Sequence, residues 1–218
     1  MLPKAILFDL DDTLHDRRAS VEAFMPTLYS FLSPWLNGVP LEDFRTVLHQ
    51  VDYGGYVPRE VFMQRLLEAF GAVGFDALQL AKFWRTEFAK FAQPMAGAYE
   101  LLDFLGSKGI KTGIVSNGTV QLQQAKIDAL KLHVDVMVIS EAVGVKKPHA
   151  KPFLEALRLL EVSASETWFV GDHPVNDIEG ASAVGMKAFF LEREQSAKTV
   201  NAIRLTHLLE LRAYVFDS

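Results

Sequence analysis

The hydrophobic pattern of the chain contains five short runs that polar residues hardly interrupt. Such runs are typical of strands buried on both faces, as in a parallel sheet, whereas strands with one face in water alternate apolar and polar residues. We therefore predict five strands in a mostly parallel sheet. They cover residues 5–8, 111–116, 134–140, 167–171 and 187–192.

Helical patterns lie between the last four of these strands. In 98–109, for example, Leu101, Leu102 and Leu105 fall on one side of a helix. The alternation of strand and helix predicts βαβ units, and therefore an α/β fold with a doubly wound, Rossmann-like parallel sheet. The other helical patterns cover 119–130, 152–160 and 175–185.

One long segment, from residue 16 to about 92, breaks this alternation. It shows helical patterns and no convincing strand, and it holds 14 of the 24 aromatic residues, which we interpret as the core of a small helical bundle. We predict a helical domain over 16–92, inserted into an α/β core made of 1–15 and 93–218. Its helices are expected at 19–32, 41–51, 58–71 and 76–92.

The composition narrows the class of protein. Of 218 residues, 50% are hydrophobic, so the chain can bury a large core and is not expected to be disordered. A net charge of -5 argues against a nucleic-acid polymer or an anionic membrane as partner. The chain has no cysteine, no apolar run of membrane-spanning length and no signal-peptide pattern. We expect a cytoplasmic protein; the oligomeric state is left open.

Polar side chains follow each of the first four predicted strands. Asp9 and Asp11 come after the first, and Ser116 with Asn117 ends the second. Because ligands of an open parallel sheet bind beyond the carboxyl ends of its strands, we expect these side chains to share one site. The third strand is followed by Lys147, and the fourth by Asp172 and Asp177.

This set of side chains suits a phosphate group and a hard divalent cation. Asp9 and Asp11 are two residues apart, so in extended chain their carboxylates point the same way. Ser116 can donate its hydroxyl hydrogen to a phosphoryl oxygen, and the backbone N–H groups of Asn117 and Gly118 can do the same. Oxygen ligands without cysteine or paired histidines favour Mg²⁺ over Zn²⁺.

Each of these motifs alone has an ordinary explanation as a turn or a capped helix start. Their occurrence in order, each after a predicted strand, favours a functional site. Two lysines precede Pro148, and we favour Lys147, the one that abuts the proline, over Lys146 as the residue that faces the site.

The motifs "FDLDDTL", "SN", "KP" and "GDxxxxD", in this order, resemble those of the haloacid dehalogenase superfamily of phosphotransferases. The resemblance implies that the inserted segment is an α-helical cap. It implies that Asp9 is the nucleophile, which becomes an aspartyl-phosphate, and that Asp11 is the general acid and then the base that activates water.

The same resemblance assigns the other site residues. Ser116 and Lys147 would bind the phosphoryl group, with Asn117 beside them. Asp172 would bind Mg²⁺ together with Asp9 and the backbone carbonyl of Asp11. Asp177 would act through metal-bound water or by orienting Lys147.

Among the chemistries of this superfamily, we favour a Mg²⁺-dependent phosphatase. Its substrate would be a small phosphate monoester, such as a nucleoside monophosphate or a sugar phosphate. The presence of Asp11 argues against dehalogenation, because a halide leaving group needs no proton. A phosphomutase on the same core and a non-catalytic phosphate-binding regulator remain as alternatives.

Substrate specificity is expected to come from the cap and from the first hinge between core and cap, which we place near residues 15–18, since loops over a rigid core vary most freely. A ring or a charge of the substrate could contact residues there. The candidates are Arg17, Arg18, Tyr53, Tyr56 and Arg59.

Overall fold

The computed structural model describes residues 2–52, 57–72, 74–193 and 202–216. The chain forms two compact units. An α/β unit comprises Met1–Arg17 and Gln93–Ser218, and a helical unit comprises Arg18–Ala92.

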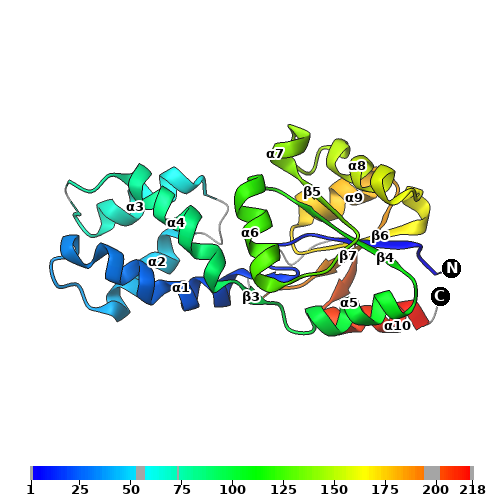
Figure 1. Ribbon diagram of the computed structural model, residues 1–218, viewed down its shortest axis with the longest axis horizontal. Helices are drawn as coiled ribbons and strands as arrows, with labels where there is room; N and C mark the ends of the chain where they lie inside the picture. The colour runs from blue at the N-terminus through cyan, green and yellow to red at the C-terminus, as the bar shows by residue number, and fades with distance from the viewer. Residues whose placement is uncertain (1, 53–56, 73, 194–201, 217–218) are drawn as a thin grey trace. The chain divides into compact units, whose positions relative to one another are not determined.

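The α/β unit is built on a six-stranded parallel sheet of order β5-β4-β1-β6-β7-β8 (Figure 1). The first strand of the chain therefore lies inside the sheet, and the chain winds outward from it in both directions. This confirms the predicted doubly wound α/β fold. The strands are β1 (Ala5–Phe8), β4 (Lys111–Ser116), β5 (Val136–Ile139), β6 (Thr167–Gly171), β7 (Lys187–Leu191) and β8 (Ile203–Leu205).

Strand β8 is the one member of this sheet that the hydrophobic pattern did not predict. It contains only three residues, with Arg204 at its centre, and pairs with the edge of β7. An edge strand of this length carries too little hydrophobic pattern to stand out from a loop.

Helices cover both faces of the sheet (Figure 1). On one face, Leu7 of β1 and Phe169 of β6 pack with Phe153 and Leu157 of α8. On the other face lie α5 and α10. The helices of this unit are α5 (Ala98–Ser107), α6 (Val120–Leu130), α7 (Ser140–Val143), α8 (Ala150–Leu160), α9 (Gly180–Ala183) and α10 (Leu211–Phe216).

The helical unit packs around aromatic side chains. Phe24 of α1 lies with its ring centroid 5.0 Å from that of Trp84, in an edge-to-face arrangement, and Phe31 stacks on Phe83 at 3.7 Å. The helices are α1 (Arg17–Leu32), α2 (Leu41–Asp52), α3 (Arg59–Ala69) and α4 (Ala77–Glu87). Among the described residues, no helix has the length and hydrophobicity needed to cross a membrane.

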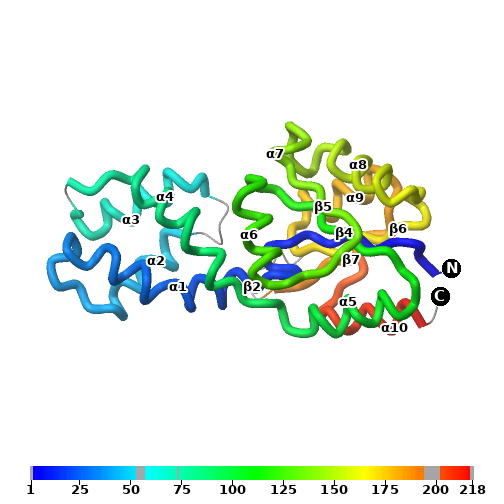
Figure 2. The backbone as a smooth tube through the Cα atoms, in the orientation of Figure 1, coloured from blue at the N-terminus to red at the C-terminus, as the bar shows by residue number. Residues whose placement is uncertain are grey.

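The chain leaves the α/β unit and returns to it through a pair of short antiparallel strands (Figure 2). Strand β2 (His15–Asp16) pairs with β3 (Gln93–Pro94). This pairing holds the two crossings of the chain side by side, directly after the acidic loop that follows β1.

Candidate active site

The register of the central strands brings three predicted site residues to one edge of the sheet. Phe8, the last residue of β1, is level with Ile114 of β4 and Val170 of β6. Asp9 continues this ladder, because its N–H donates to the carbonyl of Val170 at 2.9 Å. By this register, Asp9 is level with Val115, the residue before Ser116 at the end of β4, and with Gly171, the residue before Asp172.

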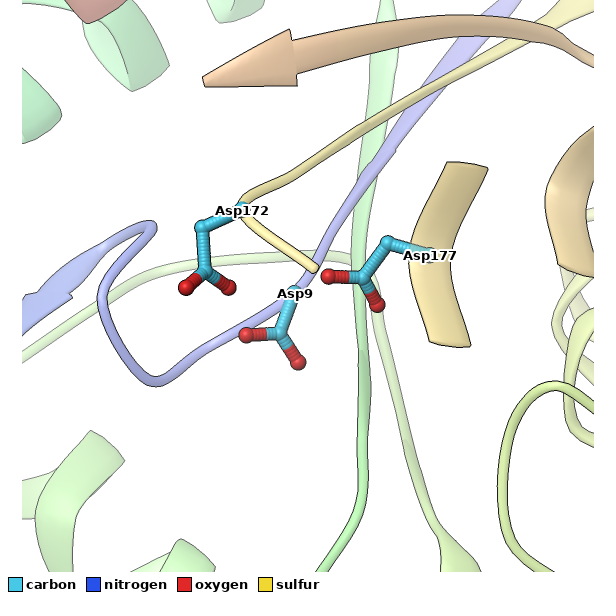
Figure 3. Close-up of side chains that lie close together, drawn as sticks. All are labelled: Asp9, Asp172 and Asp177. Carbon is cyan, nitrogen blue, oxygen red and sulfur yellow. The ribbon is translucent and has the colours of Figure 1, made fainter. Parts of the chain in front are cut away.

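Three carboxylates gather at this edge (Figure 3). One ligand oxygen each of Asp9, Asp172 and Asp177 lies within 4.8 Å of the others. Asp177 comes from the π-helical turn η5 (Pro174–Glu179), a helix form that is frequent at functional sites. It approaches β6 so closely that a Cβ atom on Gly171 would lie 2.5 Å from its carboxyl group, which explains the glycine before Asp172.

Lys147 joins two of these carboxylates. Its Nζ donates to Oδ1 of Asp9 at 2.7 Å and to Oδ1 of Asp177 at 2.6 Å. Lys147 is only 3% exposed, whereas its neighbour Lys146 is exposed to solvent. Of the two lysines before Pro148, it is therefore Lys147 that lies in the site.

Asn117 holds the backbone that carries Lys147. Its side-chain oxygen accepts from the N–H of Lys147 at 2.8 Å, and its side-chain nitrogen donates to the carbonyl of Lys147 at 3.1 Å. The N–H of Gly118 donates to the hydroxyl of Ser140 at 3.0 Å. Of the two backbone N–H groups that the sequence offered for phosphate binding, that of Gly118 is thus already bonded to Ser140, the first residue of α7.

The site is short of positive charge. Burial, reinforced by the charges of Asp177 and Asp11 and opposed by Lys147, raises the pKa of Asp9 to about 7. Burial and the charges of Asp9 and Asp177 raise the pKa of Asp172 well above its usual range. A set of oxygen ligands that repel one another, two of them buried, fits a hard divalent cation such as Mg²⁺, which would favour the charged forms of Asp9 and Asp172.

Asp11 faces a different set of side chains. Lys126 Nζ donates to both of its carboxylate oxygens, at 2.6 and 2.8 Å, and Gln123 Nε2 donates to Oδ2 at 2.9 Å. His15 Nδ1 lies 2.7 Å from Oδ1. Burial alone would raise the pKa of Asp11, but Lys126 and His15 outweigh it and hold that pKa well below its usual value.

Gln123 and Lys126 were not among the predicted site residues. They lie in α6, where the buried positions 123, 126, 127 and 130 have the spacing of one helix face. Two members of this inward face are polar, namely Gln123 and Lys126. Polar residues that share a helix face with Ile127 and Leu130 are unusual at buried positions. This pattern in the sequence could have identified Gln123 and Lys126 as candidates.

Comparison with known proteins identifies the family. The sequence model of the haloacid dehalogenase-like hydrolases matches residues 3–185. The chain belongs to the haloacid dehalogenase-like hydrolase family. The predicted family and hydrolase class are thereby confirmed.

Curated relatives of this family member are named as phosphatases, in agreement with the predicted phosphoric monoester hydrolase. A glyceraldehyde 3-phosphate phosphatase of Pyrococcus abyssi is 33% identical over 87% of this chain and 81% of the relative. A ribulose-1,5-bisphosphate 5-phosphatase of Halopiger xanaduensis is 31% identical over 92% of this chain and 90% of the relative. The fold matches that of the HAD hydrolase YfnB of Bacillus subtilis with a TM-score of 0.78, at 22% identity and 99% coverage of both chains.

The residues predicted to set the specificity of this hydrolase fall in different places. Arg17 is buried at the start of α1, and Arg18 is exposed. Arg59 lies within the helical unit, with its guanidinium 4.6 Å from the ring centroid of Trp84 and 3.9 Å from the carboxylate of Asp52. The two remaining candidates, Tyr53 and Tyr56, lie outside the described residues.

Proposed function

We propose that this hydrolase is a Mg²⁺-dependent phosphatase, which transfers the phosphoryl group of a small phosphate monoester to Asp9 and then to water. The observation that carries the proposal is the arrangement of Asp9 among Lys147, Asp172 and Asp177 at the carboxyl edge of the sheet. A carboxylate held by a buried lysine beside two further carboxylates is a nucleophile next to a cation site.

Lys147 and Ser116 prepare this edge for an anionic substrate. The hydrogen bond from Lys147 fixes one oxygen of Asp9 and leaves the other to attack phosphorus. Ser116 donates its hydroxyl hydrogen to a phosphoryl oxygen. The side chains of Asp9, Asp172 and Asp177 would hold Mg²⁺, which supplies positive charge against the repulsion between nucleophile and phosphate.

Asp11 would handle the protons of both half-reactions. In the first, the negative charge of the bound phosphate ester opposes the effect of Lys126 and His15 and raises the pKa of Asp11, so that its carboxyl group takes up a proton. This group then protonates the ester oxygen as the P–O bond of the leaving group breaks and the bond from Asp9 to phosphorus forms. In the second, its carboxylate takes a proton from the water that attacks the aspartyl-phosphate. This releases inorganic phosphate and restores Asp9.

For the substrate, we favour a phosphorylated small sugar or sugar-derived aldehyde. The relatives named for glyceraldehyde 3-phosphate and ribulose-1,5-bisphosphate each cover most of this chain, which supports this class over nucleoside monophosphates. We further propose that the helical unit acts as the cap that selects the ester. A cysteine-free chain is consistent with a cytoplasmic enzyme.

The test is phosphate release from a panel of phosphate esters with Mg²⁺, by the wild type and an Asp9→Asn variant. We expect turnover of sugar phosphates by the wild type, loss of turnover with chelator, and at least about a hundredfold loss in Asp9→Asn. Inorganic phosphate should equal the ester consumed, because a phosphomutase would instead return a phosphorylated product. Equal turnover by both proteins, or none by the wild type, would refute the proposal.

A further inference from the structure

We propose that Gln123 and Lys126 of α6 are positioning residues, which hold the carboxylate of Asp11 and the hydroxyl of Ser116 in one fixed geometry. The inference rests on the proposed function, because it gives Asp11 the proton transfers and Ser116 the phosphoryl group. Both positioning residues belong to the α/β unit, as do Asp11 and Ser116.

Gln123 connects the two groups directly. Its Nε2 donates to Oδ2 of Asp11 at 2.9 Å and to Oγ of Ser116 at 2.6 Å. A carboxylate can only accept, so the nitrogen of the amide must face Asp11, and its two hydrogens serve the two partners. Since Ser116 accepts from Gln123, its own hydroxyl hydrogen is available for a phosphoryl oxygen.

Lys126 fixes the rotation of the Asp11 carboxylate. Its Nζ lies 2.6 and 2.8 Å from the two oxygens, and the lysine is 4% exposed. Removing a lysine from water is unfavourable unless its partner is well placed. With His15 on Oδ1 and Gln123 on Oδ2, both edges of the carboxylate are held.

The backbone of the "SNG" turn leaves room for this arrangement. A Cβ atom on Gly118 would lie 2.9 Å from both Cγ and Cδ of Gln123. Glycine at this position is therefore needed by the Gln123 side chain as well as by the turn. Helix α6 starts one turn before Gln123, with Thr119 as its N-cap. The position of Gln123 is therefore set by both the turn and the helix.

The experiment compares the wild type with Lys126→Met, Gln123→Ala and Gly118→Ala, using kcat/KM for two substrates with Mg²⁺. Glycerol phosphate has a poor alkoxide leaving group that needs a proton, whereas para-nitrophenyl phosphate leaves without one. The value of kcat/KM covers the steps up to departure of the leaving group, so the ratio between the substrates reports proton donation by Asp11. Gln121→Ala, an exposed glutamine of the same helix, is the matched control.

We expect Lys126→Met and Gln123→Ala to lower kcat/KM for glycerol phosphate at least about tenfold more than for para-nitrophenyl phosphate, because small misplacements of a catalytic group are costly. Loss of the Lys126 charge also makes Asp11 easier to protonate, so the loss in Lys126→Met is expected to be smaller than that in Gln123→Ala. Gly118→Ala should show the same selective loss, and Gln121→Ala none. In an Asp11→Asn background, Lys126→Met should lower kcat/KM for glycerol phosphate no further. This absence of additivity is a result that a merely structural role would not give.

Equal losses for the two substrates, or full additivity with Asp11→Asn, would overturn the inference. If Lys126→Met fails to fold, as judged by circular dichroism and thermal unfolding, Gln123→Ala and Gly118→Ala decide it by the same ratio. Failure of the proposed function gives a different result: the wild type would then show no Asp9-dependent hydrolysis of either ester. Selective loss in the variants requires an active wild type and so separates the two cases.

Discussion

The Nζ atom of Lys147 lies 2.7 Å from Oδ1 of Asp9, although 138 residues separate the two in sequence. The same ammonium group lies 2.6 Å from Oδ1 of Asp177. One buried cation thus faces two carboxylates. The third carboxylate, Asp172, lies close to both. Acidic groups therefore outnumber basic groups at this edge of the sheet. The stability of the protein, its dependence on pH and its activity depend on this imbalance.

We expect Lys147→Met to reduce both stability and activity. Burial works against the charged form of Lys147, but Asp177 and Asp9 outweigh it and raise the pKa of Lys147, which is therefore a cation at every pH of interest. Removing it leaves two buried carboxylates without their partner, which costs about 3–5 kcal/mol of the free energy of unfolding. Urea unfolding and phosphate-release assays measure the two effects.

The matched control is Lys146→Met. Lys146 is exposed and adjacent in sequence, so its loss should change the free energy of unfolding by less than about 0.5 kcal/mol. Activity should also be unchanged. Comparable losses in the two variants would contradict the assignment of Lys147 to the site.

Without metal, the protein should lose stability as the pH rises from about 4 to 7. Asp9 has a pKa of about 7 in the folded chain, against about 3.9 for an unfolded aspartate. Between these values the folded state holds a proton that the unfolded state has released, so the stability from this group is present below pH 4 and lost above 7. Asp9→Asn removes the titration and leaves Lys147 paired with Asp177.

In the presence of chelator, we therefore expect Asp9→Asn to be more stable than the wild type at pH 8 by about 1–3 kcal/mol. The advantage should shrink toward pH 4. Addition of Mg²⁺ should raise the unfolding temperature of the wild type more than that of the variant, because binding to the folded state stabilises it. A pH-independent difference between the two proteins would show that Asp9 does not titrate in this range.

Gly171→Ala tests whether the close approach of Asp177 to β6 is needed. The added methyl group would lie 2.5 Å from the Asp177 carboxyl group, so that side chain must move away from Lys147. We expect a loss of about 1–3 kcal/mol in the free energy of unfolding, with a larger fall in activity than the stability loss explains. Thermal unfolding and kcat measure these effects.

Gly106→Ala is the control for the same chemical change. Gly106 lies in α5, and a Cβ atom there would meet nothing within 4 Å. Alanine favours a helix over glycine, so this variant should gain up to about 1 kcal/mol and keep full activity. Retained activity in Gly171→Ala would mean that Asp177 works equally well from another position.

The sequence predicted the site best where a residue of a suitable chemical type directly follows a predicted strand. The buried strands are read from continuous apolar runs, and the acidic groups follow them at the sheet edge, as Asp9 and Asp172 do. Strand β8 could not be read in this way, since three edge residues around Arg204 carry little pattern.

Contacts between residues far apart in the sequence could not be predicted from the hydrophobic pattern. Lys126 is 115 residues from Asp11, and nothing local to either one predicts that they meet. The role of Asn117 as the side chain that holds the backbone of Lys147, 30 residues away, is of the same kind. Such pairs depend on how α6 and the loop after β5 pack on the sheet, and this is decided by tertiary structure.

The conformation of Asp12 provides a last test, of the loop that carries the acidic motif. Asp12 has a φ of 59°, in the left-handed region where a Cβ atom costs about 1–2 kcal/mol. Its side chain and backbone offset that cost: Oδ1 accepts from the N–H of Arg17 at 3.3 Å, and its own N–H donates to the carbonyl of His15 at 2.7 Å. Aspartate tolerates this conformation better than most residues do.

We therefore expect Asp12→Gly to be more stable than Asp12→Ala by about 1 kcal/mol. This order is the reverse of that at ordinary positions, where the flexibility of glycine in the unfolded chain makes alanine the more stable choice. Both variants lose the bond from Arg17, so the comparison isolates the backbone. Alanine equal to or better than glycine in urea unfolding would show that the loop adopts another conformation in solution, with Asp9 and Asp11 no longer held as described.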